Sequence, residues 1–476
     1  MTNYLTTPST PETISPSYGN AHYAQNTLKV VASFANLISH QIFCLFERGV
    51  VYRGRMGEEM FELCLFDLDN TLVETDDMKD LRESGKNKND AAYIKSVKNE
   101  FLADIGRHIY SEDLIVRLRK KFPEMKIGIF TRSPRSYATT ILTLAYPSVQ
   151  WDAIVAYEDV ARTKPHGEGV HKAMLSLGCK NTAKVVLIGD GDNDIRAAYN
   201  AGCVAVLDKT SWENRLTNDN WNALGHIPDV IISDPEKIFE VIENYKAYLP
   251  ELERLLYRVD KVSSSRFDKV NKFIHRGAGG GKTAYPIFAS GRSFSGYESL
   301  KLRKKWHRLT TGIHAQKDAD QFPDAWIEAV RIFIRTQFPL LILLGGELIV
   351  SVIPHRPGRK PRLENFLDQL AASYLKEPLK GKGKVSFVSD LLAYKDGVRS
   401  NSNDKLGPVE RFENVRDHLF VKREDVVKKG PKFLIIDDVS TTGATLIYAK
   451  KYLTEAGATE VTCFSIAMNI SNVLYD

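Results

Sequence analysis

The chain has 476 residues, of which 43% are hydrophobic and 26% are charged, an ordinary balance for a globular protein with more than one core. Its net charge of +6 is mild for this length, so charge alone does not indicate nucleic acid and is compatible with small anionic molecules. The five cysteines are scattered and form no CxxC pair, which argues against a disulfide framework or a structural zinc site and favours a reducing compartment.

Residues 1–58 are predicted to form a flexible tail and a helical extension. The first 20 residues are rich in Thr, Ser and Pro and lack the pattern of a signal peptide. Residues 24–46 carry apolar side chains at helical spacing, which predicts a helix that packs on another surface. Polar residues interrupt this segment and make it too polar to span a bilayer. We therefore expect a cytoplasmic protein without membrane contact, whose helix can dock a protein partner or a second copy of the chain.

Residues 61–72 contain the first group of chemically informative side chains. A short apolar run, typical of a buried strand, ends in Asp67 and Asp69 and is followed by Thr71. At the carboxyl edge of a sheet, where α/β proteins bind ligands, two such carboxylates repel each other unless a cation or a shared proton intervenes. One of them could attack phosphorus while the other moves a proton. The alternative interpretation is a strand end with N-capping aspartates.

Between residues 59 and 248, short apolar runs alternate with helical patterns. Strands are expected at residues 62–66, 126–131, 153–157, 184–189, 204–207 and 230–233. Helices are expected at residues 114–121, 134–143, 170–177, 194–201 and 235–245. This alternation predicts an α/β domain with a doubly wound parallel sheet. Residues 75–109 are polar and helical in pattern, and we expect them to form a small cap.

Four motifs in this domain resemble those of the haloacid dehalogenase-like hydrolase superfamily. In chain order they are Asp67-Leu68-Asp69-Asn70-Thr71, Thr131 after an apolar strand, Lys164 before Pro165, and Gly189-Asp190-Gly191-Asp192-Asn193-Asp194. The resemblance implies a Rossmann-like hydrolase domain. Dehalogenases of the superfamily lack the second acid of the first motif, so Asp69 favours phosphoryl transfer. Asp192 is expected to be a solvated surface acid.

The resemblance also implies a role for each motif residue. Asp67 would be the nucleophile and Asp69 the general acid and base. Thr131 would hydrogen-bond a phosphoryl oxygen, and Lys164 would supply a fixed positive charge. Magnesium is the expected metal, because it prefers oxygen ligands. The residues expected around Mg²⁺ are Asp67, Asp69 through its backbone carbonyl, Asp190, and Asp194 as a ligand or just behind the ligands.

Residues 249–320 are predicted to be a helical and Gly/Ser-rich linker. Residues 277–283 look like a nucleotide-binding P-loop, but they are one residue short of that motif and follow no convincing strand. A mobile linker or a phosphate-proximal loop is therefore favoured. The basic stretch 301–308 could contact nucleic acid, but a solvated helix face with one buried Trp is the favoured interpretation. Nucleic acid is accordingly not an expected partner.

A second apolar strand that ends in acids lies near the C-terminus. Residues 433–436 run into Asp437 and Asp438, which precede a turn of small residues and a helix. Such a turn lets backbone N–H groups surround a phosphate at the helix N-terminus, and the acids can bind two ribose hydroxyls. An ordinary βα turn would not explain two adjacent acids. The expected phosphate-binding residues are Thr441, Thr442, Gly443, Ala444 and Thr445.

This stretch resembles the phosphoribosyl-pyrophosphate motif of type I phosphoribosyltransferases, in the manner of the competence-protein ComF-like branch. Upstream, a basic loop at residues 354–362 and the segment 410–415 extend the resemblance. It implies a second doubly wound parallel-sheet domain over residues 321–476, with phosphoribosyl pyrophosphate (PRPP) as co-substrate. Asp437 and Asp438 would contact the ribose, and residues 355–359 would meet pyrophosphate and Mg²⁺.

Two phosphate-handling motif sets on one chain lead to three hypotheses. The first is a bifunctional Mg²⁺-dependent enzyme whose C-terminal site makes or cleaves a ribosyl-5-phosphate compound or nucleotide and whose N-terminal site hydrolyses phosphate monoesters. The second is a phosphatase whose C-terminal domain only senses a nucleotide or PRPP. The third is a regulatory stress or defence component with a docked partner. Small-molecule phosphate esters are the expected ligands of the first two.

Overall fold

The computed structural model describes residues 60–212, 217–260, 264–316, 319–400, 404, 406–427 and 430–471. All described residues belong to one compact unit of the chain, residues 59–476. The predicted tail and helix of residues 1–58 therefore lie outside the described residues. Among the described residues, no helix is both long enough and apolar enough to cross a membrane.

The first sheet has six strands, all parallel, in the order β3-β2-β1-β4-β5-β6. Its strands are β1 (Leu63–Phe66), β2 (Lys126–Phe130), β3 (Ala153–Val155), β4 (Val185–Gly189), β5 (Val204–Asp208) and β6 (Val230–Ile232). Alternate residues of β1 face two different cores: Cys64 and Phe66 belong to one, and Leu63 and Leu65 to the other. The prediction of a parallel α/β sheet is confirmed for this domain.

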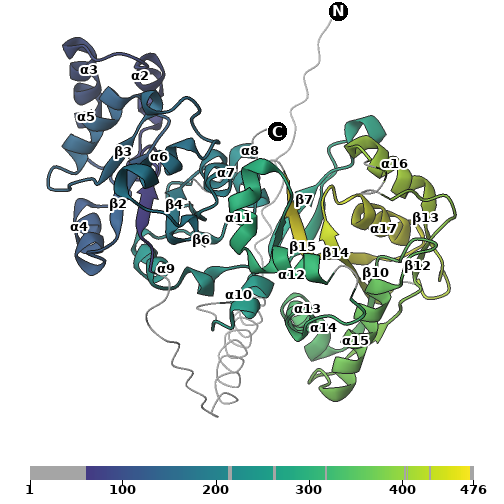
Figure 1. The fold of residues 1–476 in the computed structure, drawn as a ribbon. Coiled ribbons are helices and arrows are strands. Elements are labelled where there is room, and N and C mark those ends of the chain that lie inside the picture. Colours follow the sequence, from purple (N-terminus) through teal and green to yellow (C-terminus); the bar gives the residue numbers. More distant parts are fainter. Residues whose placement is uncertain are drawn as a thin grey trace, which may run out of the picture. The chain divides into compact units, whose positions relative to one another are not determined.

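Helices connect these strands and cover the sheet (Figure 1). They are α4 (Glu112–Lys121), α5 (Arg135–Ala145), α6 (Glu168–Leu177), α7 (Asp192–Ala201), α8 (Asn218–Gly225) and α9 (Ile238–Asn244). The segment predicted as a cap contains α2 (Lys79–Ser84) and α3 (Ala91–Leu102), preceded by a 3₁₀ turn over Asp76–Met78. Asp90 starts α3 because its carboxylate accepts a hydrogen bond from the Tyr93 N–H at 2.9 Å.

The second sheet has seven strands, ordered β11-β10-β14-β15-β8-β7, with β9 paired to β15. Its strands are β7 (Asp268–Lys272), β8 (Tyr285–Ala289), β9 (Arg292–Phe294), β10 (Gly346–Val352), β11 (Gly383–Phe387), β14 (Lys432–Ser440) and β15 (Glu460–Ile470). Within residues 321–476 the strands of this sheet all pair parallel. The segment predicted as a linker adds an antiparallel pairing, that of β7 with β8. The connection of residues 273–284, which includes the Gly-rich stretch, reverses the chain and makes this pairing possible.

Three of these strands lie in the segment predicted as a linker. β7 (DKVNK) has one apolar residue, β8 contains Pro286, and β9 has three residues, so none shows the pattern of a buried strand. They enter the sheet because the edge of β15 pairs with β8 and β9, and β8 in turn pairs with β7. The Gly-rich stretch 277–283 is therefore a strand connection between β7 and β8.

The second sheet also has a core on each face. Phe433 and Ile435 belong to one core, and Leu434 and Ile436 to the other. The surrounding helices are α10 (Glu251–Tyr257), α11 (Lys301–Trp306), α12 (Arg308–Ala315), α13 (Asp324–Gln337), α14 (Pro339–Leu344), α15 (Arg362–Lys376), α16 (Pro408–His418) and α17 (Ala444–Glu455). A small antiparallel pair, β12 (Leu392–Tyr394) and β13 (Leu419–Val421), lies beside this sheet.

A buried ion network joins residues of both sheets. Arg292 of β9 is fully buried and contacts Asp229, which precedes β6, at 2.8 Å. Its Nε also donates to Glu253 of α10 at 2.9 Å. Arg303 of α11 pairs with the same Asp229, and His307 Nε2 lies 3.0 Å from Glu253. Paired charges of both signs keep this interior junction electrically balanced.

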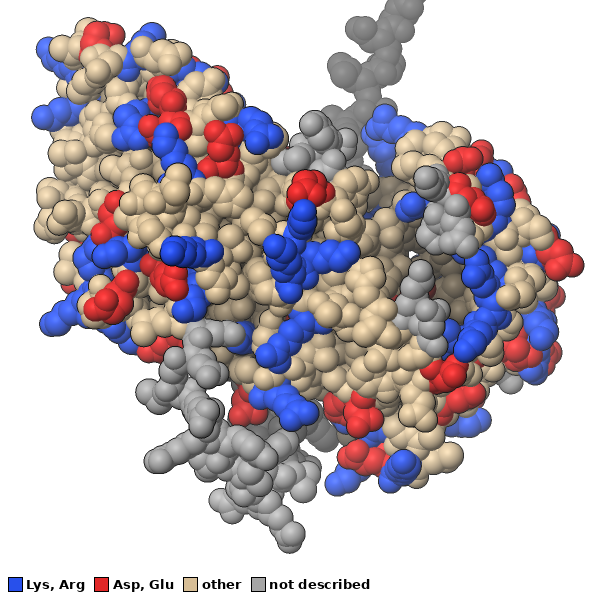
Figure 2. All heavy atoms as spheres, viewed as in Figure 1, with Lys and Arg blue, Asp and Glu red and all other residues tan. Residues whose placement is uncertain are grey.

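On the surface, Figure 2 shows Lys and Arg side chains interspersed with Asp and Glu over the face that it displays. Neighbouring charges of opposite sign cancel over about a Debye length. Local cavities, more than the mild net charge, therefore decide where anions can bind.

Candidate functional site

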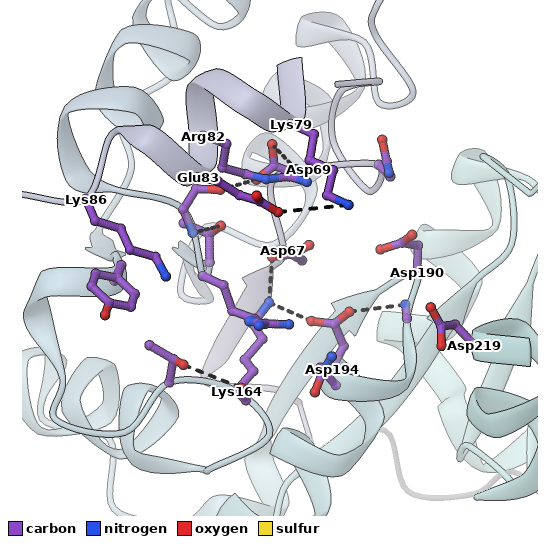
Figure 3. Close-up of a pocket in the computed structure, with 18 residues that line it drawn as sticks. Asp67, Asp69, Lys79, Arg82, Glu83, Lys86, Lys164, Asp190, Asp194 and Asp219 are labelled. Carbon is purple, nitrogen blue, oxygen red and sulfur yellow. Dashed lines mark hydrogen bonds and ion pairs between the residues drawn. The ribbon is translucent and has the colours of Figure 1, made fainter. Parts of the chain in front are cut away.

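Three adjacent strands of the first sheet end at one cavity of about 810 Å³ (Figure 3). Asp67 directly follows β1, Thr131 follows β2 and Asp190 follows β4. Because β1 lies between β2 and β4, the carboxyl ends of these strands bring the three residues to the same edge. Lys164 and Asp194 also line this cavity. The structure thus gathers the sequence-predicted residues of the first site.

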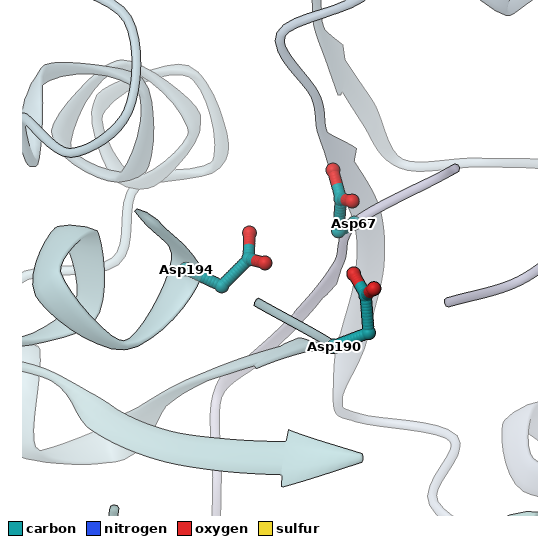
Figure 4. Close-up of side chains that lie close together, drawn as sticks. All are labelled: Asp67, Asp190 and Asp194. Carbon is teal, nitrogen blue, oxygen red and sulfur yellow. The ribbon is translucent and has the colours of Figure 1, made fainter. Parts of the chain in front are cut away.

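The centre of this site is a cluster of three carboxylates. Asp67, Asp190 and Asp194 each offer one oxygen, and these oxygens all lie within 4.8 Å of one another (Figure 4). The buried Lys164 places its ammonium between two of them, 2.5 Å from Asp67 Oδ1 and 2.6 Å from Asp194 Oδ1. The Gly191 N–H donates to the other Asp194 oxygen at 3.1 Å, which fixes Asp194 at the start of α7.

The pKa values of Asp67 and Asp190 are raised because these acids are buried close to other carboxylates. Burial raises the pKa of Asp67 to about 7; the neighbouring Lys164 opposes this shift, and Asp194 and Asp69 add to it. Burial and the charges of Asp194 and Asp67 raise the pKa of Asp190 well above its usual range. One ammonium does not balance three acids, so a hard divalent cation with oxygen ligands fits this cluster. Mg²⁺ suits these donors.

Asp69 points to a different set of partners. Its Oδ1 accepts hydrogen bonds from Thr75 Oγ1 at 2.7 Å and from the Tyr137 hydroxyl at 3.0 Å. The Ser133 hydroxyl donates to Oδ2, and Arg82 of α2 lies 3.0 Å from Oδ1. The Asp69 side chain is outside the group of three carboxylates that could share an ion, as expected if only its backbone carbonyl meets the metal.

Sequence reasoning missed these partners of Asp69. Ser133 is the only one of these partners that the local sequence could have suggested, because its hydroxyl lies two residues after Thr131. Its N–H donates to Thr131 Oγ1 at 3.0 Å, which leaves the Thr131 hydroxyl proton for a ligand in the cavity. Tyr137 and Arg82 gave no signal, because they lie on helices whose contacts depend on tertiary packing.

The cap segment lines the outer part of the cavity with basic residues. Lys79, Arg82 and Lys86 come from α2 and the turn after it, and Arg132 comes from the loop after β2. Lys86 lies over the Tyr157 ring, 4.6 Å from its centroid. Glu83 and Asp219 also line the cavity, and Lys79 and Arg82 are paired with Glu83 and Asp69, so this part of the lining carries charges of both signs.

Asp192 differs from its expected role as a solvated surface acid. Its side chain is 13% exposed and pairs with Arg196 at 3.1 Å and His226 at 2.9 Å. The expectation was wrong because the start of α7 packs beside the end of α8, and His226 follows α8 directly.

A second cavity, of about 470 Å³, lies at the carboxyl end of β14. The residues predicted from the C-terminal motif all line it: Asp437, Asp438, Thr441, Thr442, Gly443, Ala444 and Thr445. Arg356, Arg411, Val439 and Ser440 complete its lining. Gly443 has φ of +79° and packs against Ile287 and Lys272, where a Cβ would lie 2.9–3.1 Å from their atoms. Only glycine fits this close turn.

Two contacts modify the expected C-terminal site. Arg362 of α15 forms an ion pair with Asp438, so one of the two predicted ribose-binding acids already has a cationic partner. Burial and the charge of Asp438 raise the pKa of Asp437 well above its usual range. His355, expected near pyrophosphate, has its Nδ1 2.7 Å from Glu364, while Arg356 faces the cavity.

Comparison with known proteins identifies the first domain. Residues 78–207 match the haloacid dehalogenase-like hydrolase family. The matched segment contains Thr131, Lys164, Asp190 and Asp194 and begins after Asp67. The six-stranded part of the chain is a haloacid dehalogenase-like hydrolase domain, as its sequence motifs predicted.

The relatives of this domain include phosphatases. Pyrophosphatase PpaX of Oceanobacillus iheyensis is 28% identical over 135 residues, which are 28% of this chain and 58% of the relative. PpaX of Halalkalibacterium halodurans is 38% identical over 77 residues, 16% of this chain and 35% of the relative. The structure of CbbY from Rhodobacter sphaeroides in complex with phosphate is 19% identical, with a TM-score of 0.22, and covers 31% of this chain and 86% of that protein. The chain thus spans between about a third and just over half of these curated relatives.

Proposed function

We propose that the first domain hydrolyses phosphate monoesters of small molecules through an aspartyl-phosphate. The observation that carries this proposal is the convergence of Asp67, Asp190 and Asp194, whose oxygens lie within 4.8 Å of one another beside the Lys164 ammonium. Mg²⁺, when held by these residues and the Asp69 carbonyl, would neutralise charge on the phosphoryl group and orient it. The match to the hydrolase family supports the same reaction class.

In the first step, an oxygen of Asp67 attacks phosphorus and the bond from phosphorus to the ester oxygen breaks. Asp69 gives its proton to the leaving oxygen, so an alcohol departs. In the second step, Asp69 takes a proton from water, whose oxygen attacks the aspartyl-phosphate and releases inorganic phosphate. Asp67 and protonated Asp69 are then restored. The Thr131 hydroxyl and the Lys164 ammonium offset the negative charge on the phosphoryl oxygens.

The contacts of Asp69 link it to the cap segment. Three hydroxyl groups and Arg82 converge on its carboxylate. Arg82 belongs to the cap helix α2, so movement of that helix would change the contacts of Asp69.

For the second domain, we propose phosphoribosyl transfer, or its reverse, with PRPP as co-substrate. The acid pair, the turn at Gly443 and the basic Arg356 and Arg411 share one cavity of about 470 Å³. This composition suits a ribose phosphate that carries a pyrophosphate group. The two sites would then act on nucleotides or ribosyl-5-phosphate compounds, one forming or cleaving the glycosidic bond and the other removing phosphate.

The ion pair between Arg362 and Asp438 favours a second candidate function for this domain. A carboxylate that is already paired must lose its partner before it can bind ribose hydroxyls. The domain would then sense PRPP or a nucleotide without turnover, and ligand binding would release Arg362. Binding of PRPP without release of pyrophosphate would distinguish sensing from catalysis.

The proposals are tested by two separate assays on the full chain. Phosphate release from a library of phosphate esters with Mg²⁺ should be lost in Asp67→Asn and kept in Asp104→Asn, an exposed acid outside the cavity. Pyrophosphate release from PRPP with a base library should be lost in Asp437→Ala/Asp438→Ala. A wild-type protein that releases neither product would remove the enzymatic proposal.

We also propose a cytoplasmic location. The described cysteines Cys64, Cys179, Cys203 and Cys463 are free thiols, in keeping with a reducing compartment.

A further inference from the structure

A third cavity, of about 680 Å³, is lined by residues of α8 and β7 and is separate from both proposed active sites. Its volume is within the range of about 300–1,000 Å³ that small-molecule sites usually have. It is lined by residues of both elements together with Asp192, His226 and Phe273. No motif of the sequence pointed to this cavity, because α8 and β7 are about 50 residues apart and both are polar.

Two exposed aromatic side chains line this cavity. Trp221 of α8 is 44% exposed, and Phe273, directly after β7, is 49% exposed. Most large apolar residues of the described chain are buried, so two exposed rings on one cavity need an explanation. Aromatic faces offer planar ligands a stacking surface.

The polar lining has unused hydrogen-bonding capacity. Asn218 and Asn222 of α8 and Asn271 of β7 line the cavity, and among the described residues none of their side-chain amides has a hydrogen-bond partner. Each amide offers one acceptor and two donor hydrogens. That set matches the mixed donors and acceptors on the edge of a nucleobase.

Two lysines give the cavity positive charge. Lys269 and Lys272 of β7 line it. Among the residues that the structure describes, no acidic side chain pairs with Lys272, and burial lowers the pKa of its ammonium. The one acid of the lining, Asp192, is already paired with Arg196 and His226. Lys269 already lies over the Phe288 ring, 5.9 Å from its centroid. An anionic group would therefore find the Lys272 ammonium and no unpaired carboxylate in the lining.

We propose that this cavity binds a free nucleoside monophosphate. The base would stack on Trp221 and Phe273, the asparagine amides would bond its edge, and Lys272 would hold the phosphate. Two of its lining residues are close to residues of the proposed sites: Asp192 lies two residues from Asp190 and Asp194, and the stem of Lys272 packs against Gly443. The site is thus placed between the segments that carry the two proposed reactions.

The test is calorimetric titration of the full chain carrying Asp67→Asn, so that the proposed hydrolysis does not consume the ligand. Adenosine 5′-monophosphate should bind. Adenosine lacks the phosphate and ribose 5-phosphate lacks the base, and each should bind at least about tenfold more weakly. Because the readout is heat of binding, it stays interpretable even if the wild-type protein releases no phosphate.

Substitutions in the cavity and outside it test where adenosine 5′-monophosphate binds. Trp221→Leu and Lys272→Met should each weaken binding of adenosine 5′-monophosphate about tenfold or more. Tyr297→Leu, at a tyrosine that is 50% exposed and outside the cavity, should leave binding unchanged. Asp437→Ala/Asp438→Ala should also leave it unchanged.

Four results would overturn the proposal. They are an absence of binding, equal binding to Trp221→Leu, loss of binding in Asp437→Ala/Asp438→Ala, and tighter binding of a short oligoadenylate than of the mononucleotide. The third result would assign the nucleotide to the C-terminal cavity. The fourth would assign the surface to single-stranded nucleic acid. Circular dichroism of each variant checks that it is folded.

Discussion

Replacement of Arg292 by Met is the most direct test of the buried junction between the two sheets. The guanidinium is fully buried and donates to Glu253 Oε1 at 2.9 Å, Tyr199 Oη at 2.8 Å and the Ile227 carbonyl at 3.0 Å. It also pairs with Asp229 at 2.8 Å. Methionine keeps much of the volume but removes the charge and every side-chain donor.

The expected magnitude follows from what the substitution leaves behind. Asp229 keeps Arg303 and the Ala205 N–H, and Glu253 keeps His307, yet two buried carboxylates then share one full positive charge. Removal of one partner from a buried ion pair costs about 3–5 kcal/mol. Arg292→Met should therefore lower the free energy of unfolding by about this amount.

Urea denaturation followed by circular dichroism measures this loss. The matched control is Arg335→Met, which removes a guanidinium that is 39% exposed and paired with Glu328, and it should cost about 0–1 kcal/mol. Neutralising Glu253 as well, in Arg292→Met/Glu253→Gln, should restore part of the loss, because the buried charge is then gone. If Arg292→Met costs no more than Arg335→Met, the junction does not hold the two sheets as described.

Other predictions concern the two sites and the effect of pH. Lys164→Met should lower the turnover number for phosphate release by about 10²–10³-fold, since it removes the ammonium beside the nucleophile; an unchanged turnover would contradict its role. Chelation of divalent metal should abolish phosphate release and added Mg²⁺ should restore it, whereas activity in excess chelator would contradict a metal at the acidic cluster. Burial would raise the pKa of Glu253, but the adjacent Arg292 and His307 lower it well below 4.5. In acid the unfolded chain therefore binds more protons than the folded protein does. The free energy of unfolding should be steady above about pH 5 and should fall as the solution is acidified below that pH. A free energy of unfolding that rises on acidification would refute this reasoning. Arg362→Met should free Asp438 and tighten PRPP binding measured by calorimetry, and weaker binding would show that Arg362 contacts the ligand.

Local sequence patterns were sufficient to predict the first sheet. Its strands are short apolar runs separated by helical segments, and acids stand where β1 and β4 end. The residues of a strand show by themselves that it is buried on both faces, because they are nearly all apolar. A carboxylate at the end of the strand can likewise be read directly from the sequence. The same information identified the C-terminal acid pair and the turn at Gly443.

The partners of those acids were decided only by the tertiary structure. Lys164 reaches Asp67 across 97 residues, and Tyr137 reaches Asp69 across 68. The polar strand β7 joins a sheet because it pairs with the edge of β8. Residues of α8 and β7 together line a cavity that no sequence motif predicts. Periodicity records which face of an element is buried, whereas contacts between distant residues depend on strand order and helix packing, which no single segment encodes.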